Sequence, residues 1–298
     1  MIKKILKKIK NRTRWLISFP VGWFYKLTCK PPQIIGMEST LQKIISGRCS
    51  VSRYGDGEFD IMAGRDIGFQ PYNMELAEKM KKILHTEEKD FLVCINESYI
   101  STKNCTDEVR KYWKKKLRTN RHIWDKLLKN DKIYYSANIT RFYFRYKDKT
   151  NVPRIVELWK LVWAERDIVF IEGEKSRLGV GNDFFDGAKS CRRILCPPEN
   201  AFEYYDEIIA EAKKIEKSAL IFIALGPTAT AMAYDLYVEG YQAIDIGHID
   251  IEYEWYLMGS SSRIAIKDKY TNEAVNGTEV GQIEDERYQK QIISIITN

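Results

Sequence analysis

The sequence predicts an α/β protein with a Rossmann-like, doubly wound and mainly parallel sheet. Strand-like segments alternate with helix-like segments over most of the chain, which is typical of a parallel sheet covered by helices. Several of the strand-like segments are continuous apolar runs, such as ALIFIAL at 219–225, and strands that are buried on both faces show this pattern. With 298 residues, of which 44% are hydrophobic, the chain can bury a core of this kind.

The expected strands are rich in β-branched and aromatic residues, and the expected helices repeat apolar residues every three or four positions. The strands are predicted at 49–54, 90–95, 132–136, 167–171, 192–196, 219–225 and 242–246. The helices between them are predicted at 74–85, 106–129, 153–164, 201–217 and 228–239. Pro153 suits the first turn of its helix, where no N–H partner is needed. A capping box at Ser39–Gln42 predicts an earlier helix that ends near Gly47.

Positive charge is concentrated at the N-terminus. Residues 1–30 hold nine lysines and arginines and no acid, and the whole chain carries +7, so residues 31–298 carry −2. A nucleic-acid-binding domain would carry its positive charge on the main body, so we expect no nucleic-acid partner. The six cysteines form no C-x-x-C pair and are expected to be buried thiols of a cytoplasmic protein.

Residues 1–30 combine lysines with apolar residues at helical spacing and an apolar run at 15–25. That run is too short to span a bilayer, which takes about 20 residues. We expect a basic amphipathic helix that attaches the protein to an anionic membrane surface, at the inner face of the cell membrane. A helix packed on its own domain and a signal peptide are the alternatives. The predicted organisation is this anchor, a main domain at 31–258, and a C-terminal extension or lid at 259–298.

The segment after the first predicted strand carries two carboxylates, Asp56 and Glu58, between Gly55 and Gly57. In an extended segment, side chains two positions apart point to the same side, so both could bind one cation. Their oxygens suit Mg²⁺ or Mn²⁺, and the glycines, with Arg53, suit a diphosphate. An ordinary acidic turn is the alternative.

The loop at 173–183 contains three glycines together with Lys175 and Arg177. This composition suits an anion or a nucleotide, although the loop is neither a Walker A motif nor a clean G-x-G-x-x-G. Its candidate binding residues are Arg177, Gly179 and Asn182. A flexible glycine loop is the alternative.

Gly226, Thr228 and Thr230 follow the strand at 219–225 and open the next helix. Free backbone N–H groups and the helix dipole at such an N-terminus attract phosphate, and the threonines add hydroxyls. Plain N-capping is the alternative.

The last predicted strand is followed by His248, Asp250 and two glutamates. His248 and Asp250 are candidates for a general base or for further metal ligands. A capping acidic cluster with a hydrogen-bonded histidine is the alternative. In a doubly wound sheet all four loops would face one crevice, which suggests a site for a metal and a nucleoside diphosphate. The pattern leaves open whether a sugar, a phosphate or a nucleotide is transferred.

Four of these segments together resemble the bacterial GT-D-type glycosyltransferases. They are RYGDGEF at 53–59, RLGVGND at 177–183, LGPTAT at 225–230 and GYQAIDIGHIDIEYEW at 240–255. The resemblance covers about residues 37–275 and implies a GT-D fold and a nucleotide-sugar donor, typically a UDP-sugar. It also implies a divalent metal, Mn²⁺ or Mg²⁺, held through a D-x-E motif that maps onto Asp56 and Glu58.

We therefore expect a metal-dependent glycosyltransferase, a hexosyltransferase, whose acceptor is a bacterial surface glycan, a lipid-linked glycan or a glycoprotein. His248 and Asp250 are the expected catalytic residues. The expected donor-binding residues are Arg53, Gly55, Gly57, Arg177, Gly179, Asn182, Gly226, Thr228 and Thr230. A metal-dependent nucleotide or phosphate-ester hydrolase, or a nucleotide-binding peripheral membrane scaffold without catalysis, is the alternative.

Overall fold

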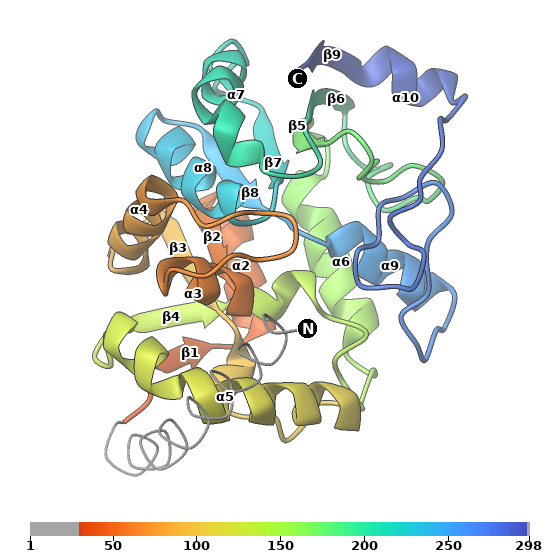
Figure 1. The fold of residues 1–298 in the computed structure, drawn as a ribbon. Coiled ribbons are helices and arrows are strands. Elements are labelled where there is room, and N and C mark those ends of the chain that lie inside the picture. Colours follow the sequence, from red (N-terminus) through yellow and green to blue (C-terminus); the bar gives the residue numbers. More distant parts are fainter. Residues whose placement is uncertain (1–29, 297–298) are drawn as a thin grey trace, which may run out of the picture.

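A computed structural model describes residues 30–296 of the chain (Figure 1). Its described strands form one parallel sheet in the order β1-β4-β3-β2-β8-β7-β5-β6-β9. The strands are β1 Gln33–Ile35, β2 Ser50–Tyr54, β3 Phe91–Ile95, β4 Ile133–Ser136, β5 Asp167–Gly173, β6 Ser190–Cys196, β7 Leu220–Ala224, β8 Gln242–Asp245 and β9 Ile292–Ile295. The predicted doubly wound α/β fold is therefore confirmed.

Helices cover both faces of the sheet. They are α2 Met37–Gly47, α3 Asp56–Met62, α4 Met74–Leu84, α5 Asp107–Leu127, α6 Val152–Trp163, α7 Tyr205–Ala212, α8 Pro227–Val238, α9 Ile249–Leu257 and α10 Glu286–Gln291. The first core cluster joins one face to α3, α4, α5, α7 and α8, and the second joins the other face to α2, α6 and α9. Strand β5 serves both: Val169 and Ile171 enter the first cluster, and Ile168 and Phe170 enter the second.

All seven predicted strands are present, with ends that differ by a few residues. The prediction missed β1 and β9, which are short strands at the two edges of the sheet and are only partly buried. The predicted capping box at Ser39–Gln42 is wrong. Helix α2 begins at Met37 after Gly36, and the Thr40 hydroxyl donates to the Gly36 carbonyl at 2.8 Å, one turn inside the helix.

The C-terminal residues complete the sheet. Strand β9 pairs with β6, with Arg193 opposite Ile292. The preceding segment, 259–285, has no regular strand or helix, and it lies against the edge of the molecule near α9 (Figure 1). Residues 1–29 lie outside the described residues, so the predicted anchor is not placed. Within 30–296, no helix is both long and apolar enough to cross a membrane.

Strands β2 and β8 lie side by side in the middle of the sheet, where the two halves of the chain meet. From this point the strand order runs outward in both directions, towards β4 on one side and β5 on the other. Ligands of doubly wound sheets bind at such a switch point, beyond the carboxyl ends of the strands. The loops that follow β2, β7 and β8 therefore occupy the expected position for a site.

Candidate functional site

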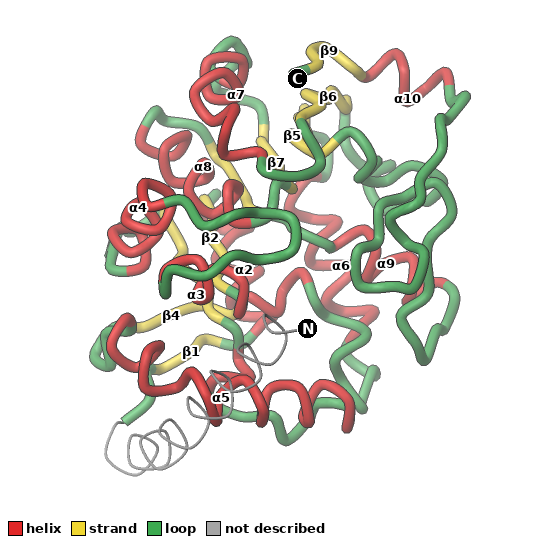
Figure 2. Tube along the Cα trace, in the orientation of Figure 1, coloured by secondary structure: helices red, strands yellow, loops and turns green. Residues whose placement is uncertain are grey.

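A cavity of about 580 Å³ lies at the carboxyl edge of the sheet. Its lining includes residues that follow β2, β3, β4, β5, β7 and β8, so loops far apart in sequence share one space, as predicted. The connection between α3 and α4 also contributes, through Phe69 and Gln70. Figure 2 shows this connection as a long loop in front of the sheet. The volume falls within the range of small-molecule and cofactor sites.

Asp56 and Glu58 both line the cavity, but they lie on a helix and not on the extended segment expected from the sequence. Helix α3 begins at Asp56, and residues two apart on a helix do not face each other. Asp56 Oδ2 accepts from Lys116 Nζ at 2.9 Å and from the Tyr112 hydroxyl. Glu58 Oε2 accepts from the Gly55 N–H at 2.7 Å and thereby caps the helix.

Each of the two carboxylates lines the cavity, so each can contribute a ligand to a cation that is also held by a substrate. Among residues 30–296, no cluster of three or more histidine, cysteine or acidic side chains could form a complete metal cage. Burial, and then the neighbouring charge of Asp245, raise the pKa of Glu58 to about 7. Mg²⁺ is commonly held by one or two carboxylates together with substrate phosphates, so the residues fit such a metal.

Arg53, near the end of β2, is held mainly by Asp245 of the neighbouring strand β8. Its guanidinium donates to Asp245 Oδ1 at 2.6 Å, to the Asp245 carbonyl at 2.8 Å and to the Thr140 hydroxyl at 2.6 Å. Gly247 has φ +49°, and a Cβ there would lie 2.0 Å from an Arg53 nitrogen. Because Gly247 leaves this space, the Arg53 side chain can reach the cavity wall, where the prediction placed it.

The N-terminus of α8 also borders the cavity. Gly226 lines it, has φ +56°, and would place a Cβ 2.5 Å from the Phe69 ring. Thr228 and Thr230 are fully buried behind it and do not line the cavity. Thr230 donates to the Arg53 carbonyl at 2.9 Å, and Thr228 donates to Gln70 Oε1 at 3.4 Å. The backbone at Gly226 can therefore meet a ligand, while the threonines support its neighbours.

His248 lines the cavity beside two residues that the sequence did not single out, Arg141 and Glu273. Burial and the positive charge of Arg141 lower the pKa of His248 to about 4, so its ring is neutral at pH 7. Arg141 forms an ion pair with Glu273. Although burial opposes ionisation, Arg141 and His248 lower the pKa of Glu273 to about 2. A neutral imidazole can accept a proton from a bound hydroxyl group.

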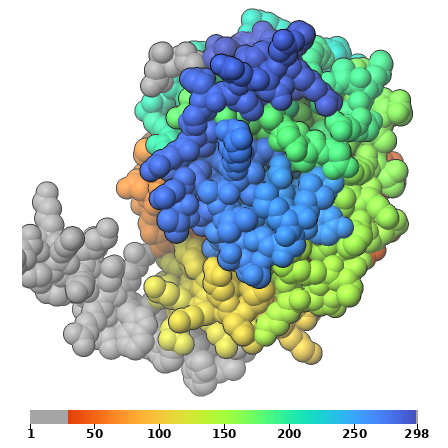
Figure 3. Space-filling view, turned by 90° about the vertical axis from the view of Figure 1, so that its right-hand side faces the viewer, coloured from red at the N-terminus to blue at the C-terminus, as the bar shows by residue number. Residues whose placement is uncertain are grey.

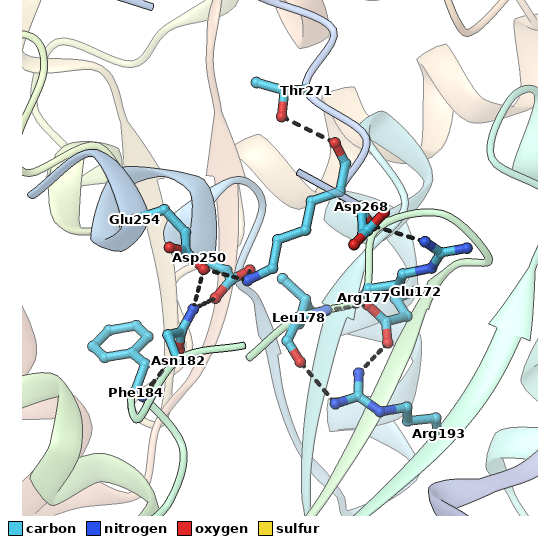
Figure 4. Close-up of polar contacts among 11 residues, drawn as sticks. Glu172, Arg177, Leu178, Asn182, Phe184, Arg193, Asp250, Glu254, Asp268 and Thr271 are labelled. Atoms are coloured by element: carbon cyan, nitrogen blue, oxygen red, sulfur yellow. Dashed lines mark hydrogen bonds and ion pairs between the residues drawn. The ribbon is translucent and has the colours of Figure 1, made fainter. Parts of the chain in front are cut away.

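Asp250 belongs to a buried cluster outside the cavity lining (Figure 4). Its side chain is fully buried and lies 2.6 Å from Lys269 Nζ, which also lies 2.7 Å from Glu254. Asn182 donates to Asp250 at 2.8 Å and to Glu254 at 2.7 Å. These contacts attach α9 to the segment 259–285. The Asp250 carboxylate is therefore engaged in holding two parts of the chain together and does not face the cavity.

Three predicted binding residues of the loop at 173–183, namely Arg177, Gly179 and Asn182, also lie outside the cavity lining. Arg177 donates to the Asp268 carbonyl at 2.9 Å (Figure 4). It also donates to the Gly281 carbonyl at 2.7 Å, and both contacts hold the same C-terminal segment. Gly179 has φ +74° and lies against Phe185, where a Cβ would be 2.7 Å from the ring. The loop at 173–183 therefore meets the cavity through other residues, Gly173, Ser176 and Leu178.

The cavity wall contains polar residues that sequence reasoning missed. They include Asn96 after β3, Tyr112 and Lys116 on α5, Arg141 after β4, and Arg263, Asn272 and Glu273 in the C-terminal segment. None of them lies in a recognisable motif. For Tyr112 and Lys116 one signal was available, since the two are four residues apart and therefore share one face of a helix.

Comparisons with known proteins agree with this geometry. The family model of the glycosyltransferase GT-D fold matches residues 51–274. The chain is 36% identical over 267 residues to "Glycosyltransferase GlyD" of Streptococcus pneumoniae serotype 4, which covers 89% of this chain and 33% of that relative. It is 35% identical over 263 residues to "Probable glycosyl transferase Gly" of Streptococcus gordonii, covering 88% of this chain and 38% of that relative. The chain thus spans about a third of the length of these curated relatives.

Solved structures give the same picture. A structure described as domain of unknown function 1792 with a distinct glycosyltransferase fold matches with a TM-score of 0.85 at 35% identity, over 90% of this chain and 97% of that one. A structure described as a new glycosyltransferase from Streptococcus sanguinis matches with a TM-score of 0.83 at 32% identity, over 89% of this chain and all of that one. With a family model over most of the chain and the same fold at this identity, the protein belongs to the GT-D glycosyltransferase family.

Proposed function

We propose that this protein is a metal-dependent glycosyltransferase that moves a sugar from a nucleoside-diphosphate donor, a UDP-sugar, to a glycan, lipid-linked glycan or glycoprotein acceptor. The observation that carries the proposal is the cavity at the switch point of the sheet. It brings the Asp56–Glu58 pair, the Arg53 guanidinium and the N-terminus of α8 to one space of about 580 Å³. Membership of the GT-D family supports the same reaction class.

The donor's diphosphate gains negative charge when the sugar–phosphate bond breaks, and the site offers positive charge and N–H donors at that place. A bound Mn²⁺ or Mg²⁺ would neutralise this charge, and Asp56 and Glu58 would hold it. Arg53 is positioned to bind the diphosphate, and the α8 N-terminus adds its backbone N–H groups. Neutral His248 is the proposed acceptor of the proton from the attacking hydroxyl, since it lines the cavity and Asp250 does not.

The proposal is tested by Asp56→Ala and Glu58→Ala, assayed for Mn²⁺-dependent sugar transfer from UDP-sugars. Each variant should lose transfer by at least about a hundredfold, because removal of one electrostatic group at a reacting centre commonly costs this much. Glu78→Ala is the matched control, since Glu78 is an exposed carboxylate paired with Lys81 on α4. Circular dichroism should show the same fold in all three.

The outcome that contradicts the metal role is full transfer by either variant, or by the wild type in excess EDTA. Release of free sugar at the same rate with and without any acceptor would assign the site to hydrolysis. Residues 1–30 are proposed, from their sequence, to hold this enzyme at the inner face of the cell membrane, where lipid-linked acceptors are present.

A further inference from the structure

Helix α5 has three faces with different surroundings. Val109, Trp113 and Trp124 are buried in the first core cluster. Tyr112 and Lys116 line the cavity. A third face points away from both, and it carries the exposed residues Lys111, Lys114, Lys115 and Arg118. These four positions follow the spacing i, i+3, i+4 and i+7, so they form one stripe along the helix, which we call the basic stripe.

The charge of the described body is strongly segregated onto this helix. Eight lysines and arginines against three acids give α5 a net charge of +5. Residues 31–298 together carry −2, so all of them outside α5 carry −7. The acids of α5 stand at its ends, at 107, 108 and 125, and none interrupts the basic stripe. With 21 residues the helix is about 30 Å long, so the stripe presents an extended positive surface.

Two large apolar residues near the stripe in the sequence are partly exposed. Tyr112 follows Lys111 on the cavity face of the helix and is 47% exposed, and Ile100, in the loop that precedes α5, is 43% exposed. Lysine-rich helices with partly exposed aromatic and aliphatic groups nearby are typical of proteins that lie on an anionic bilayer, where the charges meet the headgroups and the apolar groups enter the interface. A nucleic-acid backbone would use the charges but not the exposed isoleucine.

We propose that the basic stripe of α5 is a docking surface for an anionic lipid bilayer, separate from residues 1–30. In Figure 3, the yellow atoms of α5 lie at the molecular surface just below the blue C-terminal segment, whose Arg263 and Glu273 line the cavity. Helix α5 therefore lies next to a segment that forms part of the cavity wall, while the basic stripe itself faces away from the cavity. The basic stripe would set the orientation of the protein on the bilayer. This role does not depend on which sugar the protein transfers.

The test uses the full chain and vesicles of phosphatidylcholine with and without phosphatidylglycerol. A stripe variant carries Lys111→Gln, Lys114→Gln, Lys115→Gln and Arg118→Gln. The matched control carries four substitutions to glutamine among lysines whose ammonium groups already contact acids or a carbonyl near the opposite, amino-terminal edge of the sheet. These are Lys189→Gln, Lys213→Gln, Lys214→Gln and Lys217→Gln.

The wild type and the control should partition onto the phosphatidylglycerol vesicles alike, and the stripe variant should do so at least about tenfold more weakly, because each basic residue near an anionic surface adds to binding. Added salt should remove most of this difference. UDP affinity should stay the same, since none of the four stripe residues lines the cavity. Equal partition of the stripe variant and the wild type would overturn the proposal, as would equal losses in the stripe variant and the control. A loss of duplex DNA binding without loss of vesicle binding would assign the stripe to nucleic acid instead.

Discussion

Lys269 should be one of the most sensitive positions for stability outside the sheet. Its side chain is 3% exposed and its ammonium lies 2.6 Å from Asp250 and 2.7 Å from Glu254, which are 0% and 11% exposed. Lys269→Met keeps most of the side-chain volume but leaves two carboxylates buried without their counter-ion. Breaking a buried ion pair by removing one partner costs about 3–5 kcal/mol. Because Asn182 still donates to both carboxylates, we expect a loss of about 3 kcal/mol in the free energy of unfolding.

The assay is urea unfolding followed by intrinsic fluorescence, with Lys290→Met as the matched control. Lys290 pairs with Glu286 on the exposed side of α10, where such a pair contributes about 0.5 kcal/mol or less. Asp250→Asn combined with Lys269→Met should recover part of the loss, because one of the two unpaired charges is then absent. A loss below about 1 kcal/mol for Lys269→Met would refute the argument that this cluster fastens the C-terminal segment.

Two further predictions concern His248 in the cavity wall and Thr228 behind it. The folded pKa of His248 is about 4, below the usual value of about 6.5, so the unfolded chain binds the proton first and acid favours unfolding. The stability that depends on a neutral His248 should be complete above about pH 6.5 and should be lost as the pH falls towards 4, by up to about 3 kcal/mol. His248→Gln should lack this component, and parallel pH profiles of unfolding for the two proteins would contradict the prediction. Thr228→Val should weaken UDP binding about two- to tenfold through loss of the hydroxyl that meets Gln70, while Thr228→Ser should bind as the wild type does. Isothermal titration measures both affinities, and an unchanged dissociation constant for the valine variant would count against a role for this contact.

The sheet could be predicted because its interior strands are encoded locally. Strand β7 is a continuous apolar run, which is typical of a strand buried on both faces of a sheet. The predicted strand, 219–225, agrees with the observed one to within one residue at each end. The edge strands were missed because their pairing comes from distant partners: β1 pairs with β4 and β9 with β6, and neither is distinguished by its own three or four residues.

The site likewise has a part that the local sequence predicts and a part that depends on distant segments of the chain. Asp56 and Glu58, Arg53, Gly226 and His248 lie on the cavity as expected, because residues after parallel strands meet at one edge of the sheet. Asp250 on α9 and Arg177 in the loop at 173–183 were equally plausible candidates, but both are buried and bind residues of the C-terminal segment. No local sequence pattern predicts the ion pair between Lys269 and Asp250.

By itself, the sequence determined the parallel α/β fold, the edge at which the loops gather and the likeness to the GT-D family, since these depend on apolar periodicity and on short motifs that are contiguous in the chain. Only the tertiary structure decided which candidate side chains face the cavity, and only it separated the basic stripe of α5 from that helix's buried and cavity faces. The reason is physical: a side chain's charge and hydrogen-bonding capacity are fixed by its type. Its partner is fixed by packing between segments that may be a hundred residues apart, as Arg177 and Gly281 are.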